Sequence, residues 1–169
     1  EPNPGLFFPL GLAYLQLSMP ASALHAFTEA DRRGVFMPEE FQTMLTDLRS
    51  DMDETAREMG LPVQKMIAAM REYERGNYSL ALGDYPRAIS AYRNANRQLG
   101  AWAPARNNLA LALSLDGQLP AAINETRQVL AQDPEDMGAA CNMIRFLAWS
   151  GERAAADQQC EGDGHAQRH

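Results

Sequence analysis

Lysine, cysteine and histidine are scarce in this chain of 169 residues, and each scarcity narrows the possible functions. Lysine occurs once, at Lys65, and all other basic residues are arginines. The 22 acidic side chains outnumber the 15 basic ones and give a formal net charge of −7 at pH 7. Because this charge repels phosphate groups on average, we expect neither nucleic acid nor an anionic membrane surface as a partner.

The two cysteines, Cys141 and Cys160, form no CxxC pair and no metal-binding motif. Two thiols in a chain of this size suit a reducing compartment, so we expect a cytoplasmic location. No apolar run is long enough to cross a bilayer, and no membrane insertion is expected. The apolar stretch 5–17 lacks the flanking signals of a secretion peptide. The chain begins with Glu1 rather than Met, so it can also be a fragment of a longer, even exported, protein.

Catalytic motifs are also missing. The sequence contains no HExxH, GxSxG, P-loop or GxGxxG pattern. Of the three histidines, His25 is expected on a helix as a packed or half-exposed side chain, whereas His165 and His169 lie in a polar tail, 161–169, that we expect to be disordered. We therefore expect no enzymatic activity, no cofactor and no bound metal.

The sequence does contain an internal repeat of thirty-four residues. Gly83, Gly117 and Gly151 share one column, and an alanine follows each of them five residues later, at Ala88, Ala122 and Ala156. The segment before each glycine has the apolar spacing of a helix. We expect each glycine to end that helix with a positive φ, a second helix to begin with proline in its first turn (Pro86, Pro120), and the alanine to lie where the two helices cross.

This pattern resembles the tetratricopeptide repeat (TPR) family, whose unit is a helix-turn-helix of thirty-four residues. The clearest copy covers about 103–136 and carries Asn108, Leu109, Gly117, Ala122 and Pro134. Copies at about 69–102 and 137–160 flank it. A further copy at about 4–37 keeps Gly11, Tyr14, Ala23, Phe27 and Ala30 but has Ser18 in place of the turn glycine.

The resemblance implies an all-α fold in which about four antiparallel helix pairs stack into a right-handed solenoid within a single domain, 1–160. The segment 38–68 does not fit the period. Its part from Pro38 to Leu61 is expected as one long helix or as two short ones, with Ser50 capping the second. The same segment carries seven acidic residues against Arg49 and Arg57, whereas arginines dominate from Lys65 to Arg106.

In this family the first helix of each pair lines a concave groove, which implies the position of a binding site. The inward residues would be Met70, Tyr73, Asn77, Asn107, Leu111, Ser114, Asn142, Arg145 and Trp149, beside Leu80, Ala81, Leu115, Cys141 and Ala148. Asparagines there could bond a peptide backbone while apolar residues form pockets.

Several alternatives stay open for these residues. Asn108 and Asn142 occupy positions where the family often uses asparagine structurally, and Trp149 could pack at the end of the solenoid. Tyr73, Gly138 and Asn142 replace the basic residues of the subtype that clamps acidic chaperone tails, so that ligand is not expected. We expect a protein-interaction scaffold with a protein or peptide partner. The alternatives are a self-association module, forming homo-oligomers, and a regulatory or targeting fragment of a larger protein.

Overall fold

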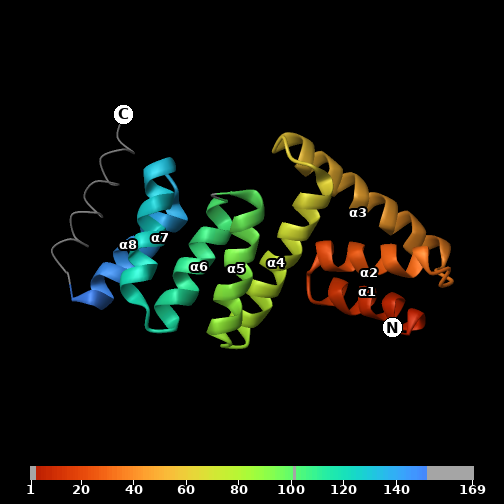
Figure 1. Cartoon of the computed structure of the whole chain (residues 1–169), viewed down its shortest axis with the longest axis horizontal. Helices are drawn as coiled ribbons and strands as arrows, with labels where there is room; N and C mark the ends of the chain where they lie inside the picture. Colours follow the sequence, from red (N-terminus) through yellow and green to blue (C-terminus); the bar gives the residue numbers. More distant parts are fainter. Residues whose placement is uncertain (1–2, 101, 152–169) are drawn as a thin grey trace. The chain divides into compact units, whose positions relative to one another are not determined.

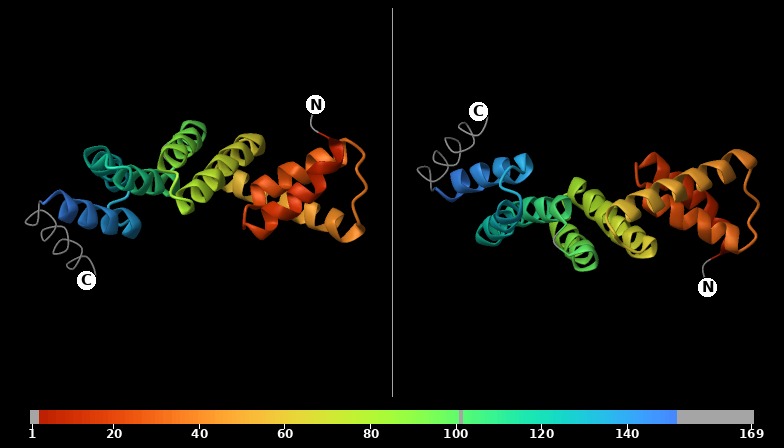
Figure 2. Two further views of the ribbon diagram at one scale, coloured as in Figure 1. Left: turned by 90° about the horizontal axis from the view of Figure 1, so that it is seen from below. Right: turned by 90° about the horizontal axis from the view of Figure 1, so that it is seen from above.

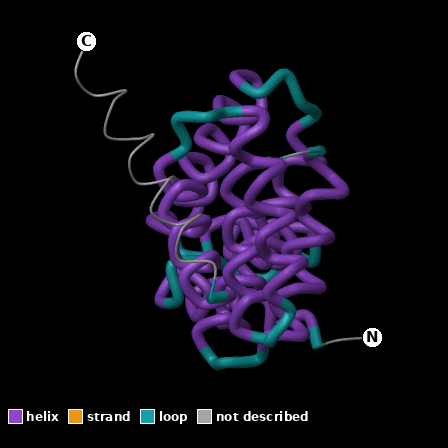
Figure 3. Tube along the Cα trace, turned by 90° about the vertical axis from the view of Figure 1, so that its left-hand side faces the viewer, coloured by secondary structure: helices purple, strands orange, loops and turns teal. Residues whose placement is uncertain are grey.

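The computed structural model describes residues 3–100 and 102–151, and all regular structure in this part of the chain is helical (Figures 1 and 3). The all-α fold class predicted from the sequence is therefore confirmed. A short 3-10 helix, Pro4–Leu6, precedes the first α-helix. The α-helices are α1 (Phe7–Gln16), α2 (Pro20–Arg32), α3 (Glu39–Glu58), α4 (Val63–Ala81), α5 (Tyr85–Leu99), α6 (Ala103–Leu115), α7 (Leu119–Gln132) and α8 (Met137–Ser150).

The chain divides into two compact units, residues 1–74 and 75–169, and the boundary falls inside α4. In the first unit α2 packs against both α1 and α3. Its core gathers around Leu24 and Phe27 of α2, and the rings of Phe8, Phe27 and Phe41 pack in tilted and edge-on pairs with centroids 5.1 to 6.3 Å apart. The segment from Pro38 to Leu61 forms one helix of 20 residues, so Ser50 caps no second helix.

In the second unit each helix packs on the next along the chain, from α5 through α8, and α6 also contacts α8 (Figure 2). Tyr92, Leu113, Val129 and Phe146 are its largest fully buried apolar side chains. The expected columns are confirmed where they are described. Gly83, Gly117 and Gly151 have φ of 74°, 81° and 83°, and Ala88 and Ala122 are fully buried. Pro86 and Pro120 lie in the first turns of α5 and α7; Ala156 lies outside the described residues.

The turn between α1 and α2 has the same construction as the glycine turns, although no glycine is present. Ser18 has a positive φ of 54°, and the next amide, Met19 N, donates to Tyr14 O at 2.9 Å. The equivalent bonds, Asp84 N to Ser79 O and Gln118 N to Leu113 O, close the turns after α4 and α6 at 2.9 and 2.8 Å. This six-to-one bond is the helix C-terminal motif that usually carries glycine.

Candidate functional site

The residues predicted to line the groove fall on α4, α6 and α8. Met70 and Tyr73, on the part of α4 in the first unit, are half-buried, and Met70 packs against the core of that unit. The remaining seven lie in the second unit on neighbouring helices: Asn77, Asn107, Leu111, Ser114, Asn142, Arg145 and Trp149. Whether these nine residues bind a ligand stays a prediction.

Asn77 joins three helices through its amide oxygen. Asn77 Oδ1 accepts hydrogen bonds from Tyr92 Oη of α5 at 2.8 Å and from Asn108 Nδ2 of α6 at 3.0 Å. The Tyr92 side chain is fully buried, so its hydroxyl needs such an acceptor. The Asn77 amide therefore has a structural task, which is to fix α4, α5 and α6 together.

Asn107 and Asn142 join α6 to α8 in a similar way. Asn107 Nδ2 donates to Asp136 Oδ1 at 3.1 Å, and the same carboxylate caps α8 by accepting from Ala139 N at 2.8 Å. Asn142 is 8% exposed and donates through Nδ2 to the backbone oxygen of Asn107 at 3.4 Å. These contacts favour the structural interpretation of the asparagines over direct ligand binding.

Most of the exposed side chains among the predicted groove residues lie on α8. On α8, Cys141, Arg145, Ala148 and Trp149 are all exposed and follow one helix face. Trp149 is 53% exposed, with its ring centroid 6.0 Å from that of Phe146, and Leu115 at the end of α6 is 42% exposed. We call Leu111, Ser114 and Leu115 together with these four residues the α6–α8 face.

The α6–α8 face combines exposed apolar surface with one cation. Arg145 makes no ion pair within the described residues, and Trp149 lies one helical turn beyond it. Ser114 Oγ is occupied by a 2.7 Å hydrogen bond to Leu111 O. Chemically, this arrangement can hold an apolar side chain against the indole and a carboxylate against the guanidinium.

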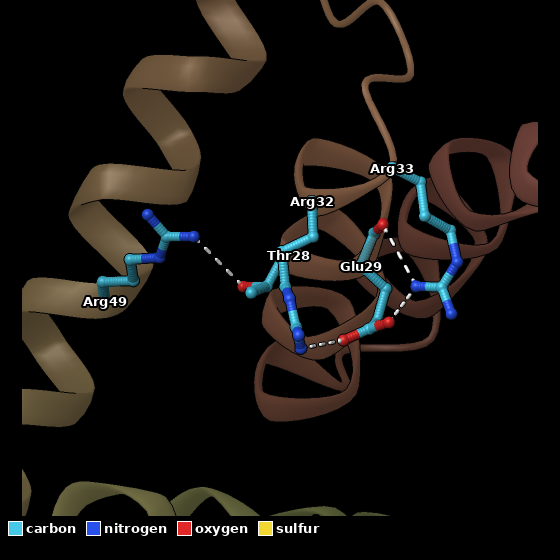
Figure 4. Close-up of polar contacts among 5 residues, drawn as sticks. All are labelled: Thr28, Glu29, Arg32, Arg33 and Arg49. Atoms are coloured by element: carbon cyan, nitrogen blue, oxygen red, sulfur yellow. Dashed lines mark hydrogen bonds and ion pairs between the residues drawn. The ribbon is translucent and has the colours of Figure 1, made fainter.

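A hollow of about 340 Å³ lies in the first unit between α2, α3 and α4 and is lined by His25, Thr28, Arg49 and Asp53 among others. Burial and the nearby charge of Arg71 lower the pKa of His25, so the imidazole is neutral at pH 7. Arg49 of α3 donates to the Thr28 hydroxyl of α2 at 3.4 Å (Figure 4).

Figure 4 also shows Glu29 between Arg32 and Arg33 at the end of α2. Arg32 Nη1 lies 3.2 Å from Glu29 Oε1, and Arg33 bonds the other carboxylate oxygen. The hydrogen bond from Arg33 lowers the pKa of Glu29. All three residues are on the surface of one helix end, so they form a local ion-pair cluster rather than a binding site.

One buried carboxylate was not anticipated from the sequence. Glu74 of α4 is 5% exposed and accepts from Ala21 N, Ser22 N and Ser22 Oγ at 2.7, 2.9 and 2.6 Å. It therefore caps the first turn of α2 from another helix. Burial raises the pKa of Glu74 even though these hydrogen bonds oppose the shift. Across the described residues, no group of three His, Cys, Asp or Glu side chains could hold a metal ion, and no helix is long and apolar enough to cross a membrane.

In comparisons with known proteins, no family model and no curated protein sequence matched the chain.

Proposed function

We propose that this chain is a non-catalytic protein-interaction module of the tetratricopeptide type, which binds a peptide segment of a partner protein on its α6–α8 face. The observation that carries the proposal is the pair on α8: Trp149, 53% exposed, one turn from Arg145, which has no ion pair within the described residues. Tryptophan and arginine are the residues that most often dominate the energy of protein interfaces.

The repeat geometry supports the choice of family. A Cβ on Gly11 of α1 would lie 2.4 Å from the Phe27 ring of α2, and a Cβ on Gly76 of α4 would lie 2.5 Å from the Tyr92 ring of α5. In both pairs the residues are sixteen apart, and the turn residue with positive φ, Ser18 or Gly83, follows the small residue by seven. The α1–α2 pair and the α4–α5 pair thus share the same close contact between a glycine of the first helix and an aromatic ring of the second.

The hydrogen bonds of the asparagines support a preformed site. Asn77, Asn107 and Asn142 bond neighbouring helices in the ways described above, so the exposed side chains between them stand on fixed backbones. A peptide that binds a preformed surface loses less entropy than one that must order it. We propose that an apolar side chain of the peptide packs on Trp149 and Leu115 while an acidic group pairs with Arg145.

The test is selection of peptides from a displayed random library on the intact chain, followed by calorimetric titration of a selected synthetic peptide. We expect Trp149→Ala and Arg145→Ala to weaken binding about tenfold or more, because interface anchors of this kind contribute roughly 2 kcal/mol. Arg127→Ala, which changes an exposed arginine of α7 outside the face, is the matched control. Equal affinity for all three variants, or failure to select any peptide, would contradict the proposed site.

A further inference from the structure

A second surface of the 75–169 unit carries charge that the described part of that unit does not neutralise. Helices α5, α6 and α7 enclose a cleft of about 440 Å³ whose lining includes Ile89, Arg93, Asn96, Arg97, Arg106 and Glu125. None of these residues belongs to the α6–α8 face. Helix α5 itself contains three arginines and no acidic residue.

The three arginines of the cleft differ in how far their charges are compensated. Arg106 Nε lies 3.5 Å from Glu125 Oε2, and Arg106 Nη1 donates to Gln128 Oε1 at 3.0 Å. Arg97 donates to the neutral amide of Asn94. Arg93 is exposed, and neither it nor Arg97 has an ion pair within the described residues. Two guanidinium groups therefore remain available to carboxylates.

The same chain carries a complementary surface on α3. Glu40, Asp47, Asp51, Glu54 and Glu58 recur at intervals of seven, four, three and four residues, which places five carboxylates along one face of the helix. We call this row the acidic stripe. All five are exposed, and none forms an ion pair within the described residues. Like charges one turn apart disfavour a helix, so an oppositely charged partner would relieve this repulsion.

The two surfaces match in spacing as well as in charge. Arg93 and Arg97 are four residues apart on α5, a rise of about 6 Å along the helix axis. Asp47 and Asp51, and again Glu54 and Glu58, are four apart on α3 and have the same rise. Two helices laid side by side can therefore form two ion pairs without a change in either backbone.

We infer that the Arg93–Arg97 cleft of one chain binds the acidic stripe of α3 in a second copy of the chain. The contact is heterologous, because it uses a different surface on each copy, and it can close into a ring or continue into a longer assembly. A second copy is the occupant that these surfaces favour, since the chain itself supplies exposed carboxylates at the spacing of the two arginines.

The test is sedimentation velocity of the full chain over a hundredfold range of concentration, at low and at physiological salt. We expect self-association that weakens at least tenfold as salt rises from about 20 to about 200 mM, since exposed ion pairs are screened. Reversing the charge of the cleft (Arg93→Glu with Arg97→Glu) should abolish self-association. Reversing the charge of the acidic stripe (Asp47→Arg with Asp51→Arg) should abolish it as well. The control, Lys65→Glu with Arg127→Glu, makes the same change of net charge as the cleft reversal at two exposed positions outside the cleft, the stripe and the α6–α8 face, and it should leave self-association intact.

The decisive experiment mixes the cleft variant with the stripe variant, after circular dichroism has confirmed that each is helical. The mixture should associate although neither chain does so alone, because the acidic cleft of one now fits the basic stripe of the other. A wild-type chain that stays monomeric at every concentration, association that survives cleft reversal, or a mixture that fails to associate would each overturn the inference. None of these outcomes bears on the α6–α8 face, whose peptide binding is measured separately.

Discussion

Gly76 of α4 lies directly against the ring of Tyr92 of α5: a Cβ at residue 76 would stand 2.5 Å from Tyr92 Cε1. That distance is well below van der Waals contact, so the helices can keep their separation only while residue 76 has no side chain. The ring is fully buried and its hydroxyl is bonded to Asn77, so it cannot move aside without losing that bond.

We predict that Gly76→Ala lowers the free energy of unfolding by about 1–2 kcal/mol. Alanine gains up to ~1 kcal/mol of helix propensity, but overpacking of a core costs about 1–3 kcal/mol and prevails. Urea denaturation followed by circular dichroism measures the difference. An unchanged or higher stability would show that the ring of Tyr92 has room to move.

The third helix pair suggests a compensating change. The positions equivalent to Gly76 and Tyr92 are Ala110 of α6 and Thr126 of α7, and both are fully buried. In this pair, alanine takes the place of glycine and the smaller threonine takes the place of tyrosine. Tyr92→Thr alone should destabilise through the cavity that it leaves. The double variant Gly76→Ala with Tyr92→Thr should be more stable than the sum of the two single effects by about 1 kcal/mol, within the usual range for contacting residues. Additivity would show that the two residues are not coupled.

Ser18 permits a prediction of the opposite sign. Its φ of 54° places a residue with a Cβ in the left-handed region, which costs roughly 1–2 kcal/mol, whereas glycine adopts it freely but gains entropy in the unfolded chain. We expect Ser18→Gly to raise stability by up to ~1 kcal/mol. Gly117→Ser, at φ 81°, should lower it by a similar amount. Destabilisation by Ser18→Gly would mean that the serine side chain contributes more than the turn conformation costs.

Glu74 makes stability depend on pH. Because burial raises its pKa in the folded chain above the ordinary value of 4.5, the folded state holds the proton more tightly than the unfolded state. The contribution of this pKa shift to the free energy of unfolding is therefore fully present below pH 4.5, and it decreases as the pH rises through the pKa of Glu74 in the folded chain. We expect Glu74→Gln, which turns an amide donor toward the donors of α2, to destabilise at every pH and by more at pH 4 than at pH 8. A larger effect at pH 8 would show that the three hydrogen bonds outweigh burial and lower the pKa.

The periodic features of the fold were predictable from the sequence, and the contacts between distant residues were not. The column of Gly83 and Gly117, with alanine five residues on, fixes a turn and a close helix crossing by local chemistry alone. The positive φ of Ser18 could not be predicted, because serine rarely adopts this conformation and its presence does not indicate one. Glu74 caps α2 by bonding to Ser22 and Ala21, which precede it by 52 and 53 positions in the sequence. No local sequence pattern indicates a contact between residues so far apart.

The candidate site was likewise predictable only in part. The resemblance to the TPR family placed Arg145 and Trp149 among the groove residues, and both are exposed in the structure. The sequence could not show that Asn77 bonds to Tyr92 and Asn108, because hydrogen bonds between helices depend on the angle and distance at which they pack. The cleft beside Arg93 likewise arises from three helices, although the absence of acidic residues from α5 was a visible signal.

The asparagine contacts also predict which substitutions separate stability from binding. Asn77→Ala removes the hydrogen bond from the Tyr92 hydroxyl to the Asn77 amide oxygen and should destabilise by about 1–2 kcal/mol. Arg145→Ala, at an exposed position without an ion pair in the described residues, should change stability by no more than ~0.5 kcal/mol. Thermal denaturation compares the two; equal destabilisation would mean that Arg145 has a structural role too.

The central claim is that a peptide binds across α6 and α8, and the most direct measurement is a backbone amide chemical-shift titration of the isotope-labelled chain with a library-selected peptide. We predict that the largest shifts fall within 107–115 and 141–149, that they saturate, and that Trp149→Ala moves saturation to a peptide concentration about tenfold higher or more. Saturating shifts confined to α5 and α7, or to residues 3–74, would contradict the claim and move the binding surface elsewhere.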